Sequence, residues 1–342
     1  MGTARWPMGF AVATVAMAAT AGAMGPTNAR AEGKYSAITP FRHEPAFRST
    51  KDKWPLVITP DAQRQLPVYR DFGALYNVGS VIGRGGFGLV HLGRDNASNA
   101  PVAIKRVCKK TTSKEKFLQE VEILRTMGGS HNVVELCDAF ETDDAYVLVT
   151  ELVDGQELFD HLMDNGVFTE NQAQSFVREV AQTLSYLHAH DVVHGDIKPE
   201  NILLSASSSS IRLIDFGQSF RANDRSERQR SVGSGVATMA YAPPEVIRGA
   251  KSATEETGRA IDMWALGVVL YIILCGYHPF DPENGVADDV LRSRILTGEM
   301  DCSSPEWLAL SSEARDLIQR LLHADPATRC SAEEVLTHVW LS

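Results

Sequence analysis

Residues 192–201 read Val-Val-His-Gly-Asp-Ile-Lys-Pro-Glu-Asn, and Asp-Phe-Gly follows at residues 215–217. Upstream of them, residues 83–88 read Gly-Arg-Gly-Gly-Phe-Gly, a glycine pattern that several nucleotide-binding folds and many turns share. A dinucleotide-binding loop should open a helix, but two β-type runs follow here, and the second ends in Lys105. The glycine loop therefore lies between strands, where its backbone N–H groups can cover phosphates and Lys105 can add a point charge.

A helix is predicted after the second of these strands. Phe117, Val121 and Leu124 recur at the spacing of one apolar helix face. Glu120 lies beside that face. As an isolated residue it would be a solvated charge, but its spacing from Lys105 favours an ion pair that holds the ammonium group on a phosphate.

Further helices are predicted downstream. Residues 261–275 are apolar all round, which favours a buried helix; a membrane span is the alternative, but the uncharged run after Asp262 is too short to cross a bilayer. Ser331 and Glu334 form a capping box before the last helix. Another capping box, Thr169 with Gln172, precedes an apolar helix face made by Val177, Val180, Ala181, Leu184 and Leu187.

These motifs, in this order, resemble the eukaryotic protein kinase family. The resemblance continues through residues 238–245 (Thr-Met-Ala-Tyr-Ala-Pro-Pro-Glu) and 262–267 (Asp-Met-Trp-Ala-Leu-Gly) to Arg329, and it covers residues 76–341. It implies one kinase domain with an α+β fold of two lobes. The small lobe is expected to be β-rich with one helix, and the large lobe to be mainly helical.

The resemblance also implies roles for single residues. Asp196 is expected to accept or orient the proton of the substrate hydroxyl. Lys198, which is typical of Ser/Thr kinases, is expected to neutralise the transferred phosphate. Asn201 and Asp215 carry hard oxygen ligands and are expected to bind Mg²⁺.

Lys105, held by Glu120, is expected to contact the α- and β-phosphates of ATP. The other positions expected around ATP are Ile82, Gly83, Gly85, Gly88, Val90, Ala103, Glu151, Val153 and Leu203.

The sequence therefore predicts ATP- and Mg²⁺-dependent phosphoryl transfer to Ser or Thr hydroxyls of proteins. The alternative is a catalytically silent nucleotide-binding scaffold, which would usually have lost Lys105, Asp196 or Asp215. A small-molecule kinase is disfavoured by residues 238–245, because this segment docks a polypeptide in protein kinases.

Glu157, Glu200 and Thr238 are the expected contacts with the substrate. In the basophilic kinases that this sequence resembles, carboxylates at the first two positions receive an arginine three residues before the target hydroxyl, which a guanidinium can bind bidentately. The position that adds a preference for a second arginine holds Ile272, so one strong arginine is expected. The alternative is that Glu157 is a solvated charge at a helix start and Glu200 is structural.

Within the family, the large lobe resembles the calcium/calmodulin-dependent kinase group at residues 277–281 (Tyr-His-Pro-Phe-Asp), 305–307 (Pro-Glu-Trp) and 314–318 (Ala-Arg-Asp-Leu-Ile). The calmodulin-binding segment of that group normally follows the position of Ser342, and no such segment is seen, so calmodulin regulation is not predicted.

Two residues depart from the family pattern. Gly195 replaces the usual arginine of His-Arg-Asp, and Pro243 replaces the alanine of Ala-Pro-Glu. The missing arginine would normally pair with a phosphorylated activation-loop residue, so its absence argues against phospho-activation. Ser231 and Ser234 are candidate phosphosites, or simply exposed serines.

The charge balance is acidic, with 33 Lys and Arg against 43 Asp and Glu and a formal net charge of -10. Residues 1–70 hold 9 basic and 4 acidic residues, so residues 71–342 are strongly acidic. This balance argues against a general nucleic-acid binder and favours basic protein partners.

Cysteines and histidines could suggest a metal site or a disulfide framework. The five scattered cysteines contain no C-x-x-C pair, which favours buried thiols. His188, His190 and His194 allow a zinc hypothesis, but the resemblance makes His194 a packed scaffold residue.

The N-terminus resembles a targeting leader. Arg5 precedes an uncharged run over residues 9–24, and residues 29–31 offer a small-residue cleavage site. Residues 1–31 are therefore expected to be a secretory or organellar leader removed near Ala31, with a retained membrane anchor or a cytoplasmic protein without a leader as alternatives. Residues 32–75 carry 5 of the 15 prolines and are expected to form an irregular linker.

Overall fold

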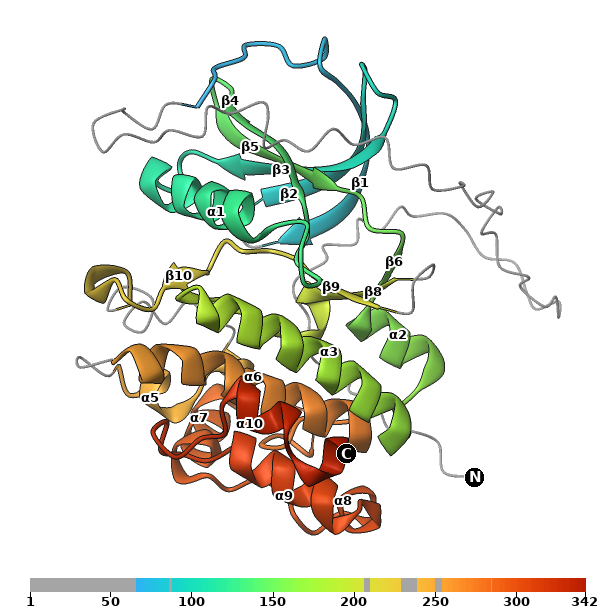
Figure 1. Ribbon diagram of the computed structural model, residues 1–342, viewed down its shortest axis with the longest axis vertical. Coiled ribbons are helices and arrows are strands. Elements are labelled where there is room, and N and C mark those ends of the chain that lie inside the picture. The colour runs from blue at the N-terminus through green and yellow to red at the C-terminus, as the bar shows by residue number, and fades with distance from the viewer. Residues whose placement is uncertain (1–65, 86–87, 206–209, 229–238, 250–253, 284) are drawn as a thin grey trace, which may run out of the picture.

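Two lobes of different composition make up the described part of this computed structural model (Figure 1). A sheet with one helix lies above a larger group of helices, which is the predicted α+β architecture of two lobes. The structure describes residues 66–85, 88–205, 210–228, 239–249, 254–283 and 285–342.

The small lobe is built on an antiparallel five-stranded sheet. Within β3, Val102 and Ile104 are completely buried, whereas Ala103 and Lys105 point to the opposite face, as the alternation of a strand requires. The two β-type runs predicted after the glycine loop are therefore confirmed as strands. The strands lie in the order β1 (Tyr76–Gly85), β2 (Gly88–Asp95), β3 (Pro101–Cys108), β5 (Ala145–Glu151) and β4 (Leu136–Glu141).

The segment before β1, residues 66–75, packs on this sheet. It contains an isolated bridge from Val68 to Glu141 but no helix, and Tyr69 and Phe72 each place a ring 5.3 Å from that of Phe140. The predicted irregular backbone is therefore present here, but these residues belong to the small lobe instead of forming a free linker. Residues 1–65 lie outside the described part.

The helix predicted after β3 is α1 (Lys114–Met127). Ser113 caps its N-terminus by accepting a hydrogen bond from the backbone N–H of Lys116. The predicted apolar face is buried, and Phe117 stacks on Tyr146 with ring centroids 4.9 Å apart. On the same helix, Glu120 reaches Lys105 on β3, whereas Gln119 reaches Ser219 in the large lobe.

The large lobe is mainly helical. The predicted capping box is present, with Thr169 and Gln172 each bonding the backbone of the other, and the predicted apolar face of α3 is fully buried. The helices are α2 (Leu158–Asn165), α3 (Glu170–Ala189), α5 (Pro244–Ile247), α6 (Glu255–Cys275), α7 (Asp288–Thr297), α8 (Pro305–Ala309), α9 (Ser312–Leu321) and α10 (Ala332–Leu336).

Short strands and single helical turns connect these helices. Ser331 and Glu334 form the second predicted capping box, at the start of α10. The strands are β6 (Gly155–Glu157), β8 (Ile202–Ser205) and β9 (Ile211–Leu213) in one sheet and β7 (Val192–Val193) with β10 (Phe220–Arg221) in another; the turns are η2 (Pro199–Asn201), η3 (Met239–Tyr241) and η4 (Val339–Leu341).

Helix α6 is the centre of the large lobe. It is long and apolar enough to cross a membrane, but 89% of its most apolar window is buried inside the protein, so the predicted buried helix is confirmed. It packs against α3 and α9. At Gly267 a Cβ atom would lie 2.8 Å from the Cβ of Leu321, so only glycine permits this approach to α9.

A buried ion pair joins α5 to the segment before α10. Arg329 donates to both carboxylate oxygens of Glu245, at 2.7 and 3.0 Å, and to the carbonyl oxygen of Ala260 at 2.7 Å. We expect Arg329→Met to lower the free energy of unfolding by about 3–5 kcal/mol, because it leaves a buried carboxylate without its partner. Thermal and urea denaturation measure this loss.

The matched control is Arg320→Met. Arg320 pairs with Asp316 at 2.7 Å, but both side chains are about half exposed, so its loss should cost less than about 1 kcal/mol. Equal destabilisation by the two variants would contradict the assignment of Arg329 as the buried structural cation.

The cysteines only partly follow the prediction. Cys137, Cys275 and Cys330 are buried free thiols, but Cys108 and Cys302 are exposed, so the prediction was wrong for these two. Cys108 is the last residue of β3, and Cys302 lies in irregular backbone before α8.

Candidate active site

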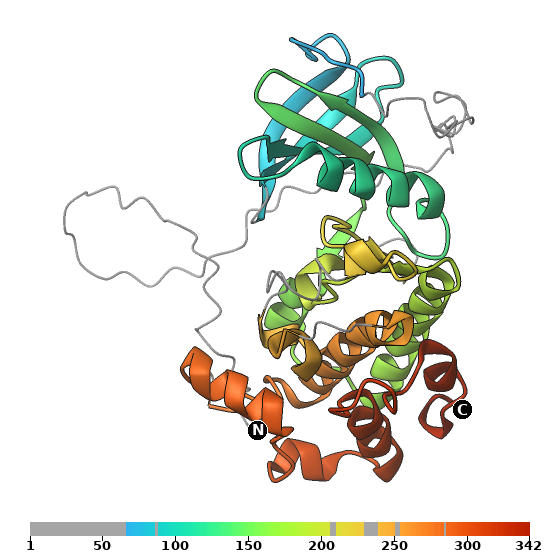
Figure 2. The ribbon, with the colours of Figure 1, turned by 90° about the vertical axis from the view of Figure 1, so that its left-hand side faces the viewer.

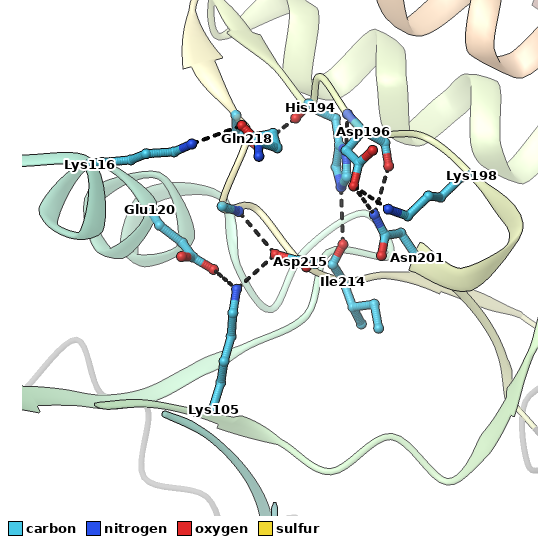
Figure 3. Close-up of polar contacts among 12 residues, drawn as sticks. Lys105, Lys116, Glu120, His194, Asp196, Lys198, Asn201, Ile214, Asp215 and Gln218 are labelled. Carbon is cyan, nitrogen blue, oxygen red and sulfur yellow. Dashed lines mark hydrogen bonds and ion pairs between the residues drawn. The ribbon is translucent and has the colours of Figure 1, made fainter. Parts of the chain in front are cut away.

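Three charged side chains from three elements meet where the small lobe faces the large lobe (Figure 3). Lys105 on β3 places Nζ 2.8 Å from Glu120 Oε1 on α1 and 2.8 Å from Asp215 Oδ1, which follows β9. The predicted pair of Lys105 and Glu120 is therefore present in the structure, and Asp215 joins it.

Burial and neighbouring charges shift the pKa values of Lys105 and Asp215 in opposite directions. Burial alone would lower the pKa of the Lys105 ammonium, but the carboxylates of Glu120 and Asp215 outweigh it and hold that pKa above its usual value. Burial would raise the pKa of Asp215, but Lys105 lowers it to about 2. Lys105 is therefore a cation and Asp215 an anion throughout the physiological pH range.

A second group of polar residues surrounds Asp196, in the loop after β7. Lys198 Nζ lies 2.7 Å from Asp196 Oδ2, and Asn201 Nδ2 donates to the same oxygen at 2.9 Å and to the Asp196 carbonyl at 2.8 Å. These bonds fix the orientation of the carboxylate. Because Asn201 donates through its nitrogen, its oxygen Oδ1 is the atom that can ligate a cation.

A buried aspartate on α6 anchors this loop. Asp262 accepts the backbone N–H groups of Gly195 at 2.8 Å and His194 at 2.9 Å, and His188 on α3 lies 2.9 Å from the same carboxylate. In the sequence Asp262 lies within one of the family motifs, but no role was predicted for it. The signal was available, because a carboxylate beside a long apolar run requires buried hydrogen-bond donors.

The histidines of the zinc hypothesis have other partners. His194 Nε2 lies 3.1 Å from the carbonyl oxygen of Ile214, and its Nδ1 accepts the backbone N–H of Asp196, so the ring joins the Asp196 loop to the residue before Asp215. His190 bonds the carbonyl oxygen of Tyr186. Across the described ranges, no cluster of three or more His, Cys, Asp or Glu side chains is arranged to hold a metal ion.

Comparison with known proteins agrees with this geometry. The family model described as protein kinase domain matches residues 76–341, more than three quarters of the chain. The chain belongs to the protein kinase family. The rat calcium/calmodulin-dependent protein kinase type 1B is 37% identical over 275 residues, which cover 80% of this chain and 76% of that protein.

Other relatives are longer than the rat kinase. Calcium-dependent protein kinase 8 of Arabidopsis thaliana is 36% identical over 80% of this chain and 50% of its own length. The probable serine/threonine-protein kinase pXi of Dictyostelium discoideum is 35% identical over 78% of this chain and 36% of its own. The chain thus spans a third to a half of several relatives, and within the family it resembles the calcium/calmodulin-dependent group.

Strand register brings together residues that were predicted to surround ATP. Val90 on β2 pairs with Lys105 on β3, and Ala103 lies two residues from Lys105, so all three side chains share the face of the sheet that carries the charged cluster. Gly83 pairs with Val90 and extends this face to β1. Leu203 is on β8 of the large lobe, where it pairs with Glu157 on β6.

The remaining predicted positions lie on the same strands or at their ends. Ile82 and Gly85 are on β1, Gly88 begins β2, Glu151 ends β5, and Val153 follows it before β6. Ile82 is half exposed, so it can still be covered by a ligand.

The glycines indicate how a nucleotide fits. A Cβ at Gly88 would lie 1.8 Å from the carbonyl oxygen of Arg106, so the fold itself requires glycine there. A Cβ at Gly83 would meet only Val90, at an ordinary 3.5 Å, so packing does not require glycine at this position. The bare backbone at Gly83 instead suits a phosphate that approaches closely. Members of this family generally use ATP and Mg²⁺, and the carboxylate of Asp215 and the amide oxygen of Asn201 suit that cation.

Two glutamates on the large-lobe side form a separate acidic site. Glu157 precedes α2 and Glu200 lies in η2. Burial, followed by the charges of Asp160 and Glu200, raises the pKa of Glu157 to about 7. Burial also raises the pKa of Glu200, and its Oε2 atom is buried without a hydrogen-bond partner. Lys198 is close enough for its charge to lower both pKa values, but among the described residues neither carboxylate forms an ion pair. Thr238, Ser231 and Ser234 lie outside the described residues.

Proposed function

We propose that this kinase domain transfers a phosphoryl group to Ser or Thr hydroxyls of protein substrates. The observation that carries the proposal is the joint presence of the Lys105, Glu120 and Asp215 cluster and the bonded trio of Asp196, Lys198 and Asn201. ATP, bound with Mg²⁺, would supply the phosphoryl group.

The residues of the chain would contribute mainly positioning and charge. Lys105 offers a permanent cation to phosphate oxygens, and Asp215 and Asn201 offer oxygens to the metal. Asp196, held by Lys198 and Asn201, can accept a hydrogen bond from the hydroxyl and would take its proton as the oxygen–phosphorus bond forms and the bond from phosphorus to the leaving ADP breaks. Lys198 lies beside this carboxylate, where its ammonium group can neutralise the transferred phosphate.

The experiment is incubation of the purified chain with Mg²⁺, labelled ATP and a degenerate peptide library. We expect label on Ser and Thr and none on Tyr. The label on Ser and Thr should be lost when Mg²⁺ is chelated. Nucleotide binding without transfer to any peptide would instead support the silent-scaffold alternative.

We also propose that the acidic site of Glu157 and Glu200 binds an arginine three residues before the target hydroxyl. Two partly buried carboxylates with raised pKa values and an unpartnered oxygen favour a ligand that brings positive charge and several donors. A planar guanidinium meets both requirements. Ile272 on α6 is apolar and buried, which supports the expectation of one arginine and not two.

Activity is expected not to depend on phosphate in the activation segment. Gly195 offers no guanidinium to pair with a phosphorylated residue. The phosphatase-treated Ser231→Ala, Ser234→Ala double variant should therefore keep most of the parent kcat/KM on the same peptide. A near-total loss of activity would refute this prediction.

A further inference from the structure

Hydrogen bonds join one face of α1 to the segment that follows Asp215, which lies directly below that helix in Figure 2. Lys116 Nζ donates to Gln218 Oε1 at 2.9 Å (Figure 3). Gln119 Nε2 donates to the carbonyl oxygen of Ser219 at 2.9 Å and to Glu227 Oε2 at 3.0 Å. Each bond spans about a hundred residues of sequence, so they tie the two lobes together.

Glu227 is the centre of this arrangement. Its Oε2 atom accepts the Gln119 amide and also the backbone N–H of Arg221, at 2.8 Å. Arg221 belongs to β10, which pairs with β7, the strand that leads directly into the loop of Asp196. One carboxylate oxygen therefore connects α1 to the strand pair that supports the catalytic loop.

Gln119 is the immediate neighbour of Glu120. A shift of α1 that lengthens the bond from Gln119 to Glu227 also moves Glu120 relative to Lys105. From this geometry we infer that Gln119 and Glu227 form a clasp that holds α1 where Glu120 meets Lys105. Both are positioning residues for the phosphoryl transfer proposed above, on which this inference rests.

The segment with Gln218 and Phe220 also packs closely on the backbone of Gly195. Gly195 has φ +79°, and a Cβ there would lie 2.8 Å from the carbonyl oxygen of Gln218 and 3.6 Å from the ring of Phe220. The segment after Asp215 thus packs directly on the backbone of Gly195. A residue with a side chain at position 195 would collide with this segment, so position 195 cannot supply a side chain that holds it. Glu227 supplies an anionic acceptor that does not depend on phosphorylation.

The experiment compares Glu227→Leu with Glu227→Gln in the full chain. A hydrogen bond to a charged group is strong enough that the leucine variant should lose about tenfold in kcat on a peptide substrate. The glutamine variant keeps an acceptor oxygen and should retain most of the activity. Glu299→Leu, which replaces an exposed glutamate beyond α7, is the control and should match the parent.

Two further measurements separate positioning from stability. Gln119→Leu removes the other half of the clasp and should reproduce the kcat loss, with an unchanged melting temperature and little change in KM for the peptide. In a Glu120→Gln background, Glu227→Leu should have less than about twofold effect, because the clasp acts through the pair with Lys105.

The outcomes distinguish this inference from the proposed function. An inactive parent chain refutes the proposed function itself. An active parent with an equally active Glu227→Leu variant overturns the clasp, as does an equal loss in the Gln and Leu variants. A full tenfold loss in the Glu120→Gln background also overturns it.

Discussion

Replacing Lys105 by methionine, Asp196 by asparagine or Asp215 by alanine is expected to lower kcat by a factor of about 10²–10⁴, the range for loss of a positioned catalytic group. Each substitution removes one charge from the two bonded groups that face each other in Figure 3. Single-turnover phosphorylation of a peptide at saturating ATP measures the loss. The losses should not add when two substitutions are combined, because the residues act as a unit.

Two matched control substitutions lie in the small lobe, near Lys105. Lys109→Met removes a lysine that pairs with Glu141, and Asp144→Asn neutralises an exposed aspartate beside Arg106. Both should keep the parent rate, because neither side chain belongs to the charged cluster of Lys105. Parent rates in all three active-site variants would show that the assignment of the site is wrong.

Much of this site could be predicted because its residues lie in short local motifs. The order of the glycine loop, Lys105, Asp196 and Asp215 placed each residue on a strand or in a loop, and the apolar spacing of α1 placed Glu120 toward Lys105. Such patterns encode which face of an element is buried. Together with the family resemblance they were sufficient for the fold and for the pair of Lys105 with Glu120, but not for the bond from Lys105 to Asp215.

Contacts between distant segments could not be predicted in this way. Nothing in the sequence near Gln119 or Glu227 indicates that their side chains meet, since each is an ordinary polar residue in an amphipathic or irregular stretch. The same holds for Tyr69 and Phe72, whose packing on Phe140 depends on the path of the chain before β1. Proline-rich composition predicted irregular backbone before β1, but composition carries no information on whether such backbone is packed.

Arginine three residues before the target hydroxyl is expected to raise kcat/KM by about 10–100-fold over alanine at that position, the equivalent of one or two charge-assisted hydrogen bonds. Lysine should give a smaller gain, because it cannot bond two carboxylates in the same planar arrangement. A peptide array with Arg, Lys or Ala at this one position measures both ratios.

The acidic site adds a dependence on pH that tests the role of Glu157. Because burial and the neighbouring charges of Asp160 and Glu200 raise the pKa of Glu157 to about 7, this carboxyl is largely protonated below pH 7 and ionised above it. The ratio of kcat/KM for the arginine and alanine peptides should therefore rise between about pH 6 and pH 8. Taking the ratio cancels any titration that affects catalysis with both peptides.

Glu157→Gln should flatten this rise, because the amide keeps the size of the side chain but cannot ionise. Asp164→Asn, at the other end of α2, is the matched control and should leave both the ratio and its pH dependence unchanged. Bound arginine stabilises the ionised carboxyl, so with the arginine peptide the pH midpoint of the rate at saturating peptide should lie below the midpoint of kcat/KM. A ratio that is independent of pH in the parent, or a rise that persists in Glu157→Gln, would show that Glu157 does not receive the arginine.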